Sequence, residues 1–305
     1  MEQSPQKNIA SMAATNIADA KSIPSQPIAV PLFATSAYLS FAEWPKESTA
    51  ACVHACEIHH PSAGRVTAYA KMYRATVGGR GLLNEISAFI LGRALGAPMA
   101  DHAFVCMIPL SRLSSPPSHH KWIRELLAKN KNADFPAFCT SKMDGSDAVI
   151  EYLRAGSKVF SEDIRKWRAL PLASRFDQHI SNTDRHLGNL RRTAKHTYKL
   201  FDHGRIVTDD GDWIASDLAS RTGKKNTDSL LLEAWPDGCP AEVVSDILLH
   251  LGYHETALTI ALPDLRWWWS RLAEPSDAAS FEKYLIYRAA ELKTMYQTAY
   301  GQLPL

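Results

Sequence analysis

The segment His179–Asn189, HISNTDRHLGN, decides the fold expected for this chain. Its last eight residues, NTDRHLGN, combine two amides, one carboxylate, one guanidinium and one imidazole, and Leu187 is their only large apolar side chain. A helix or strand that packs on a core rarely concentrates polar groups in this way. Asp184 and Asn189 are therefore predicted to lie in a loop that carries chemistry.

A second polar motif, Asp202-His203-Gly204, follows Asn189 further along the chain. YKLFDHG predicts a strand that ends in a loop, and a hairpin with LRRTAKHT at its turn fits between the motifs. Such a hairpin places Asn189 beside Asp202. Amide and carboxylate oxygens are ligands that Mg²⁺ accepts together with waters and phosphate oxygens. The arrangement predicts phosphoryl transfer, with Asp184 placed to receive a proton from an attacking hydroxyl.

The residues upstream predict a small lobe of strands around one helix. The expected strands are IAVPLFATSAYLSF, AACVHACEI, RVTAYAKMY, HAFVCMIPL and, as a short strand or connector, AFCTSKM (137–143). GLLNEISAFILGRALG has helical spacing of apolar residues and a plausible stop at Gly96. In VTAYAKMY, Lys71 alternates with Ala70 and Met72 and is expected to point away from the core.

The remaining segments complete the expected α+β organisation. Residues 1–27 are poor in large apolar groups and predict a disordered tail. Within the polar stretch 111–134, SSPPSHH is interpreted as a loop. SEDIRKWRALPLASRFDQHIS is interpreted as one helix with Ser161 as its N-cap. Helical patterns dominate from about residue 228. The chain is therefore divided into a tail (1–27), a strand-rich N-lobe (28–143) and a helical C-lobe (144–305).

These motifs together resemble the catalytic and metal loops of the protein-kinase-like fold. The form Asn-x-Asp-Arg-His-x2-Asn is similar to that of HipA-like kinases and of their relatives, the phosphatidylinositol 3/4-kinases. VTAYAKMYRA and GLLNEISAFILGRALGAPMADHAFV are similar to the HipA-like region in which a strand lysine precedes an Asn-Glu helix. The resemblance covers about residues 28–205.

The resemblance implies a bilobal α+β kinase-like fold with ATP in the cleft. Asp184 would be the catalytic base, and Asn189 and Asp202 would hold Mg²⁺. Lys71 would contact the α- and β-phosphates. Glu85 would pair with Lys71 and fix the ammonium group where phosphate arrives; an exposed pair of this kind stabilises by only about 0.2–1 kcal/mol.

Other polar residues have more open interpretations. His186 either takes part directly in catalysis, as in the lipid-kinase relatives, or organises the loop by hydrogen bonds. Arg185 is interpreted as structural or substrate-facing. No Gly-x-Gly-x-x-Gly precedes the strand lysine, so WPKEST, 44–49, is the nearest phosphate-covering turn, with Ser48 and Thr49 as candidates for nucleotide contact. DHG stands where many kinases have DFG, so regulation by a Phe flip is not expected.

The composition of the chain limits the classes of function that it can have. An apolar fraction of 46% supports a core, and a net charge of +2 gives no support for a dedicated nucleic-acid binder. The five cysteines are odd in number and scattered, which favours reduced thiols and a cytoplasmic protein. No apolar run approaches the roughly 18 residues that cross a bilayer.

The expected function is Mg-ATP-dependent phosphorylation of serine or threonine on a protein. The HipA-like resemblance also implies a toxin-like or regulatory role in a bacterium, with an antitoxin-type partner. Two alternatives stay open: a lipid or small-molecule kinase, suggested by the Asp-Arg-His loop, and a non-catalytic module that binds nucleotide or a partner.

Overall fold

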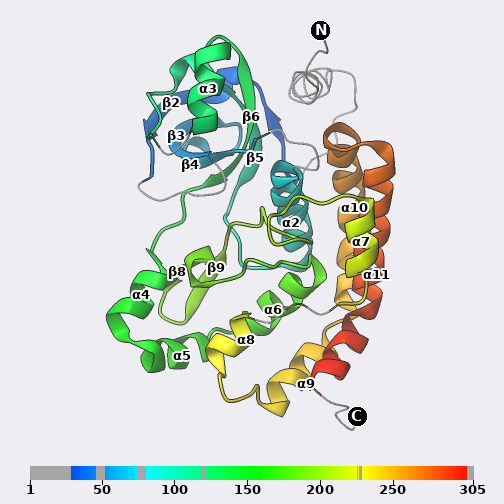
Figure 1. Ribbon diagram of the computed structural model, residues 1–305. Helices are drawn as coiled ribbons and strands as arrows, with labels where there is room; N and C mark the ends of the chain where they lie inside the picture. Colours follow the sequence, from blue (N-terminus) through cyan, green and yellow to red (C-terminus); the bar gives the residue numbers. More distant parts are fainter. Residues whose placement is uncertain are drawn as a thin grey trace. The chain divides into compact units, whose positions relative to one another are not determined.

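The computed structural model describes residues 29–45, 52–74, 80–118, 121–224, 226 and 229–300 (Figure 1). These residues form two compact units, one built from the described residues up to Leu82 and from Ala100–Lys142, the other from Leu83–Met99 and the residues from Met143 onward. Residues 83–99, placed in the N-lobe by the sequence analysis, thus group with the C-terminal residues. The expected tail and the nucleotide candidates Ser48 and Thr49 lie outside the described residues.

The first unit contains a six-stranded sheet in the order β1-β5-β6-β4-β3-β2. β1 pairs with β5 in parallel, and the other neighbours are antiparallel. The strands are β1 (Leu32–Phe33), β2 (Tyr38–Glu43), β3 (Cys52–His60), β4 (Gly64–Met72), β5 (Ala103–Pro109) and β6 (Asp134–Ser141). The predicted strands of β3, β4 and β5 are confirmed, and β3 and β4 pair as an antiparallel hairpin.

The helix α3 (Lys121–Asn130) covers one face of this sheet; it lies in the polar stretch 111–134, directly after the predicted loop SSPPSHH, where no helix was predicted. Ile123 is fully buried, and Leu126 and Leu127 pack against the same apolar cluster. These three positions have the i, i+3, i+4 spacing of an amphipathic helix. The helix was not predicted because its apolar stripe is short and the remaining residues of the segment are polar.

Lys71 lies near the end of β4, between Val53 of β3 and Phe138 of β6. Ala70 and Met72 belong to the apolar cluster under α3. Since side chains alternate along a strand, Lys71 projects from the opposite face, as predicted. It is nevertheless 91% buried, with a relative exposure of 9%.

The second unit is mainly helical and contains a small sheet in the order β7-β8-β9. Its strands are β7 (Ser146–Asp147), β8 (Leu190–Ala194) and β9 (Thr197–Leu200). Its helices are α2 (Gly81–Leu95, which starts in the first unit), α4 (Ala148–Ala155), α5 (Ser157–Arg165), α6 (Leu170–His179), α7 (Ala215–Arg221), α8 (Ser229–Ala234), α9 (Ala241–Leu249), α10 (Tyr253–Leu272) and α11 (Pro275–Tyr300). The predicted α+β class is confirmed, with a strand-rich N-terminal sheet and a helical C-terminal part.

The helix expected before the polar loop is two helices, α5 and α6. Ser161 does not cap a helix; it lies inside α5, and its Oγ donates to the Glu233 carbonyl at 2.8 Å. Pro171 lies in the first turn of α6, where a missing backbone N–H costs nothing. The predicted stop of α2 is confirmed, because Gly96 has φ +72, the left-handed conformation that ends many helices.

Aromatic side chains fill the core of the second unit. Trp213 and Trp269 both contact the ring of Phe281, at centroid distances of 4.6 and 5.4 Å. In the segment RWWWSRL (266–272), Trp268 and Trp269 are buried, whereas Trp267 lies under the Arg271 guanidinium. Among the described helices, none combines the length and the apolar character that crossing a bilayer requires.

Candidate functional site

The polar loop begins where α6 ends, and Asn182 braces its backbone. The Asn182 amide N–H donates to the Asp177 carbonyl at 2.8 Å, and its Nδ2 donates to Asp177 Oδ1 at 2.9 Å. The side-chain oxygen of Asn182 accepts the Asp184 amide at 3.0 Å. Ser181 has φ 54, so the chain reverses sharply at this point. Asn182 therefore fixes the start of the loop to the end of α6.

Arg185 holds the loop together through hydrogen bonds and is buried, with only 3% of its side chain exposed. Its Nε and Nη2 donate to the two carboxylate oxygens of Asp177 at 2.9 and 3.1 Å. Its Nη1 donates to the carbonyls of Asn189 and Phe201 at 2.8 and 2.9 Å. Of the two interpretations left open for Arg185, the structural one accounts for these contacts.

Asn189 is oriented by a single hydrogen bond of its amide nitrogen. Nδ2 donates to the Asp184 carbonyl at 2.7 Å, and the side chain is 4% exposed. Because the nitrogen is committed, the carboxamide oxygen points elsewhere as an acceptor, and it accepts no hydrogen bond from the described residues. A carboxamide oxygen of this kind is one of the hard ligands that Mg²⁺ accepts.

The hairpin predicted between the two motifs is present. β8 and β9 pair with Leu190 opposite Leu200, and the Phe201 amide donates to the Asn189 carbonyl at 3.3 Å. Asp202 is the next residue, so it leaves the same end of the hairpin at which Asn189 enters. The structure therefore brings the backbones of the two predicted metal ligands together.

Asp202 starts a loop that α2 holds in place. Asp202 has φ 59, a left-handed conformation that aspartate tolerates better than most residues. The next amide, of His203, donates to Glu85 Oε2 at 3.0 Å. The following carbonyl, of Gly204, accepts Asn84 Nδ2 at 2.7 Å. Two neighbouring side chains of α2 thus fix the residues directly after Asp202.

Asn84 is fully buried and forms hydrogen bonds with three groups of this loop. Besides Gly204, its Nδ2 reaches the Gly211 carbonyl at 2.8 Å, and its Oδ1 accepts Trp213 Nε1–H at 3.0 Å. The sequence analysis gave a role to Glu85 and none to Asn84. The available signal was two consecutive polar residues inside the otherwise apolar run LLNEISAFIL.

His203 occupies the position that is Phe in DFG motifs, and its ring is buried. The ring packs edge-on against Phe176 at a centroid distance of 5.5 Å. Burial lowers the pKa of His203, although the Glu85 carboxylate, 3.8 Å from Nδ1, opposes the shift. The neutral imidazole therefore fills an apolar position while remaining close to a carboxylate.

Asp184 is partly exposed and has two basic neighbours. Its Oδ1 lies 3.4 Å from Arg205 Nη1 and 3.9 Å from His186 Nε2. His186 Nδ1 accepts the Gly188 amide at 3.0 Å, so in the neutral ring the proton resides on Nε2, the side of Asp184. His186 thus organises the loop, while its direct catalytic role remains a prediction. Arg205 was not among the sequence candidates.

The other candidates remain predictions. Lys71 belongs to the first unit and Glu85 to the second, and their pairing is an expectation from sequence. Within the described residues, no three His, Cys, Asp or Glu side chains gather as a metal cluster. The two oxygen ligands predicted here, from Asn189 and Asp202, suit Mg²⁺, which keeps waters and phosphate oxygens in its shell.

Replacing Asn84 with leucine is expected to destabilise the second unit by roughly 3 kcal/mol or more. Three buried groups lose their partner, and each such group costs about 1–3 kcal/mol. Hydrogen exchange of α2 amides during urea unfolding measures the loss. Ser87→Ala is the matched control, since it removes one buried acceptor, that of Trp269 Nε1 at 2.9 Å. Equal losses in the two variants would contradict the prediction.

Neither a family model nor a curated protein matches this chain. Among solved structures, a MAP kinase from Leishmania major is 11% identical, with a TM-score of 0.32 over 95% of this chain and 87% of that chain. A Mycobacterium tuberculosis protein in complex with erythromycin is 13% identical, with a TM-score of 0.29 over 96% and 85% of the two chains. Both likenesses are distant, and the function proposed below rests on the geometry of the loop and the hairpin.

Proposed function

We propose that this protein is an ATP-dependent phosphotransferase whose magnesium-binding residues are Asn189 and Asp202. The observation that carries the proposal is the orientation of Asn189. The side-chain nitrogen of Asn189 is held by the Asp184 carbonyl. The hairpin register brings the backbone of Asp202 close to that of Asn189. A carboxamide oxygen (Asn189), a carboxylate (Asp202) and a second, partly exposed carboxylate (Asp184) are then supplied by one loop system.

Each residue has a defined part in the proposed reaction. Asp184 orients the attacking hydroxyl and accepts its proton, since it is the exposed carboxylate of the loop. Asn189 and Asp202 hold Mg²⁺, which supplies charge neutralisation at the phosphate oxygens. Arg205, 3.4 Å from Asp184, offers a positive charge on the side of the acceptor. Lys71 is expected to contact the α- and β-phosphates.

The acceptor is proposed from the resemblance of the motifs. The Asn-x-Asp-Arg-His-x2-Asn loop and the Asn-Glu helix support a HipA-like serine/threonine protein kinase. A toxin-like or regulatory role, and an antitoxin-type partner, are proposed on the same resemblance. The Asp-Arg-His loop also supports a lipid or small-molecule acceptor, and the experiment below separates these acceptors.

The test uses purified full-length protein with ATP and Mg²⁺. We expect intact-mass spectrometry to show the added mass of phosphoryl groups on serine or threonine, absent from Asp184→Ala. Labelled ATP added to a lysate, followed by separation into protein, lipid and soluble fractions, identifies the acceptor class. Label in the lipid or soluble fraction alone would replace the protein-kinase assignment. Nucleotide binding with no transfer to any fraction, unchanged in Asp184→Ala, would show a non-catalytic module.

A further inference from the structure

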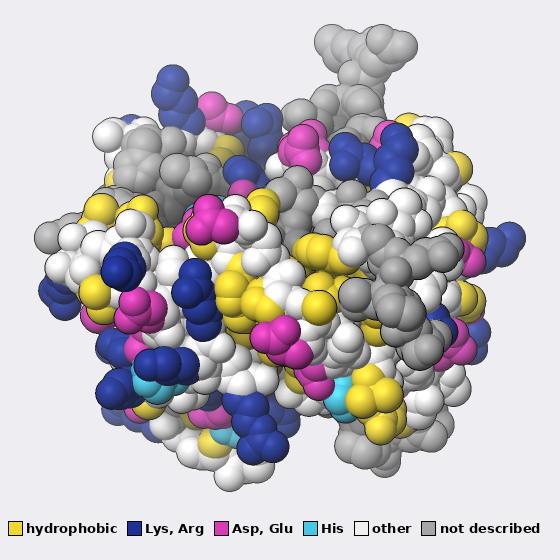
Figure 2. All heavy atoms as spheres, turned by 90° about the horizontal axis from the view of Figure 1, so that it is seen from below, with side chains coloured by type: hydrophobic (Ala, Val, Ile, Leu, Met, Phe, Trp, Pro, Cys, Tyr) yellow, Lys and Arg dark blue, Asp and Glu magenta, His cyan; other side chains and the backbone are white. Residues whose placement is uncertain are grey.

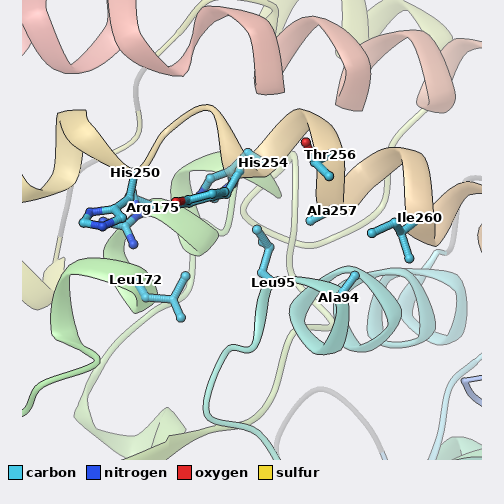
Figure 3. Close-up of a pocket in the computed structure, with 10 residues that line it drawn as sticks. Ala94, Leu95, Leu172, Arg175, His250, His254, Thr256, Ala257 and Ile260 are labelled. Atoms are coloured by element: carbon cyan, nitrogen blue, oxygen red, sulfur yellow. The ribbon is translucent and has the colours of Figure 1, made fainter.

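A pocket of about 310 Å³ lies within the second unit, and none of the loop residues described above lines it. Its walls come from the end of α2, the middle of α6, His250 and the start of α10 (Figure 3). Small-molecule sites in proteins have volumes of about 300–1,000 Å³. The pocket is therefore large enough for a small ligand.

The lining of this pocket has its charged side chain at one end, with Leu172 beside it, and Thr256 is the polar residue among the apolar ones at the other end. Figure 3 shows Arg175 and His250 at one end, and Ala94, Ala257 and Ile260 toward the other. Ile260 is 68% exposed, and several other large apolar side chains of the helices are also exposed. Figure 2 shows apolar side chains among charged ones on one face of the molecule. A ligand that satisfies both ends must have one polar or charged group and an apolar body.

Arg175 is buried, with 7% exposure, but only part of its guanidinium has partners. Its one hydrogen bond among the described residues runs from Nη1 to the Asp246 carbonyl, at 3.4 Å. The Asp246 carboxylate lies 4.0 Å from the same Nη1 and is half exposed. Nε has no hydrogen-bond partner among the described residues. Nε is also closed to solvent, so a ligand in the pocket can meet the guanidinium at Nη2 but not at Nε.

The edge formed by Nε and Nη2 pairs with carboxylates in several other arginines of this protein. A planar guanidinium matches a carboxylate through two parallel N–H···O bonds. Three other arginines use Nε and Nη2 in this way, Arg185 on Asp177, Arg192 on Asp163 and Arg266 on Glu282. Arg288 places the same edge on the Gln178 carbonyl, so the edge does not select carboxylates by itself. Arg175 lines the polar end of the pocket, and its positive charge favours a carboxylate there.

The two buried histidines near Arg175, His179 and His254, are uncharged. His179 Nε2 lies 3.2 Å from the Leu285 carbonyl, so it carries the proton, and His179 Nδ1 accepts from His254 Nδ1 at 3.1 Å. Burial lowers the pKa of His179 to about 3 and that of His254 well below its ordinary value. Both rings are neutral, and the pocket holds a single buried positive charge.

We propose that this pocket binds a small carboxylate with a branched aliphatic body. The carboxylate pairs with the Arg175 guanidinium through Nη2, and the aliphatic body contacts Ala94, Ala257 and Ile260. This site is separate from the proposed phosphotransferase site and does not depend on it.

The test compares 4-methylpentanoate with its neutral amide, 4-methylpentanamide, on the full-length protein by ligand-observed NMR. We expect saturable binding of the acid, and binding of the amide weaker by about 10- to 100-fold, because hydrogen bonds to a charged partner are lost. No saturable binding of the acid, or equal binding of the amide, overturns the proposal.

Two variants locate the ligand. Arg175→Met is expected to weaken acid binding to the level of the amide. Ile260→Asp, at an exposed position that the fold tolerates, is expected to weaken it about tenfold by removing apolar contact and adding like charge. Ile286→Asp, on an exposed face of α11 outside the pocket, is the control and should bind normally. Unchanged binding in Ile260→Asp overturns the proposal even where Arg175→Met does not fold.

Discussion

Asp202→Asn is expected to reduce Mg²⁺-dependent phosphoryl transfer by on the order of 10²–10³-fold, with little effect on folding. A metal ion contributes several kcal/mol of charge stabilisation in such reactions, and each 1.4 kcal/mol is a factor of ten in rate. Asparagine keeps the shape of the side chain but removes the negative charge that attracts the cation. It also tolerates the left-handed conformation of residue 202, φ 59, which alanine would adopt only with strain.

The measurement pairs transfer from labelled ATP with the thermal shift that Mg-ATP produces. Asp209→Asn is the matched control, because it makes the same chemical change at an exposed position of the same loop. The control should retain both signals, whereas Asp202→Asn should lose the Mg²⁺-dependent part of each. A full Mg-ATP shift in Asp202→Asn would remove the residue from the metal site, and with it the proposed function.

Local patterns explain why the loop and the hairpin could be predicted from sequence. A polar run without large apolar residues cannot line a core, and two strands with a polar turn between them pair with their neighbours in the chain. The register then follows from the turn, which is why Asn189 and Asp202 were expected together. The alternation that turns Lys71 away from the apolar cluster is likewise a local property of β4.

The contacts that fix the site are long-range and had no local signal. Asn84 reaches carbonyls 120 and 127 residues further along the chain, and its role depends on where α2 packs. The same holds for the grouping of residues 83–99 with the C-terminal part. Asp177 was interpreted as one more residue of a helix, because nothing near it in sequence shows that Arg185 turns back onto it.

Arg185→Met is expected to destabilise the second unit by about 3–5 kcal/mol. The substitution leaves the Asp177 carboxylate, 9% exposed, as a buried charge without its partner, and removing one member of a buried ion pair costs this much. It also removes the Arg185 donor from the carbonyls of Asn189 and Phe201, of which that of Asn189 keeps the Phe201 amide at 3.3 Å. Arg185→Lys is expected to destabilise the second unit, but by less than Arg185→Met. One ammonium group cannot reach all four acceptors in the planar arrangement that arginine uses.

Arg65→Met provides the matched comparison for this prediction. Arg65 contacts Glu57 at 3.1 Å, nearly the distance of the Arg185–Asp177 pair, but its side chain is 71% exposed. Water screens such a pair, so its loss should cost less than about 1 kcal/mol. Hydrogen exchange of α6 amides for Arg185→Met, and of β4 amides for Arg65→Met, measures each unit separately. Similar losses in both would mean that Arg185 holds the loop no more firmly than a surface contact, and Asp184 and Asn189 would then need another source of order.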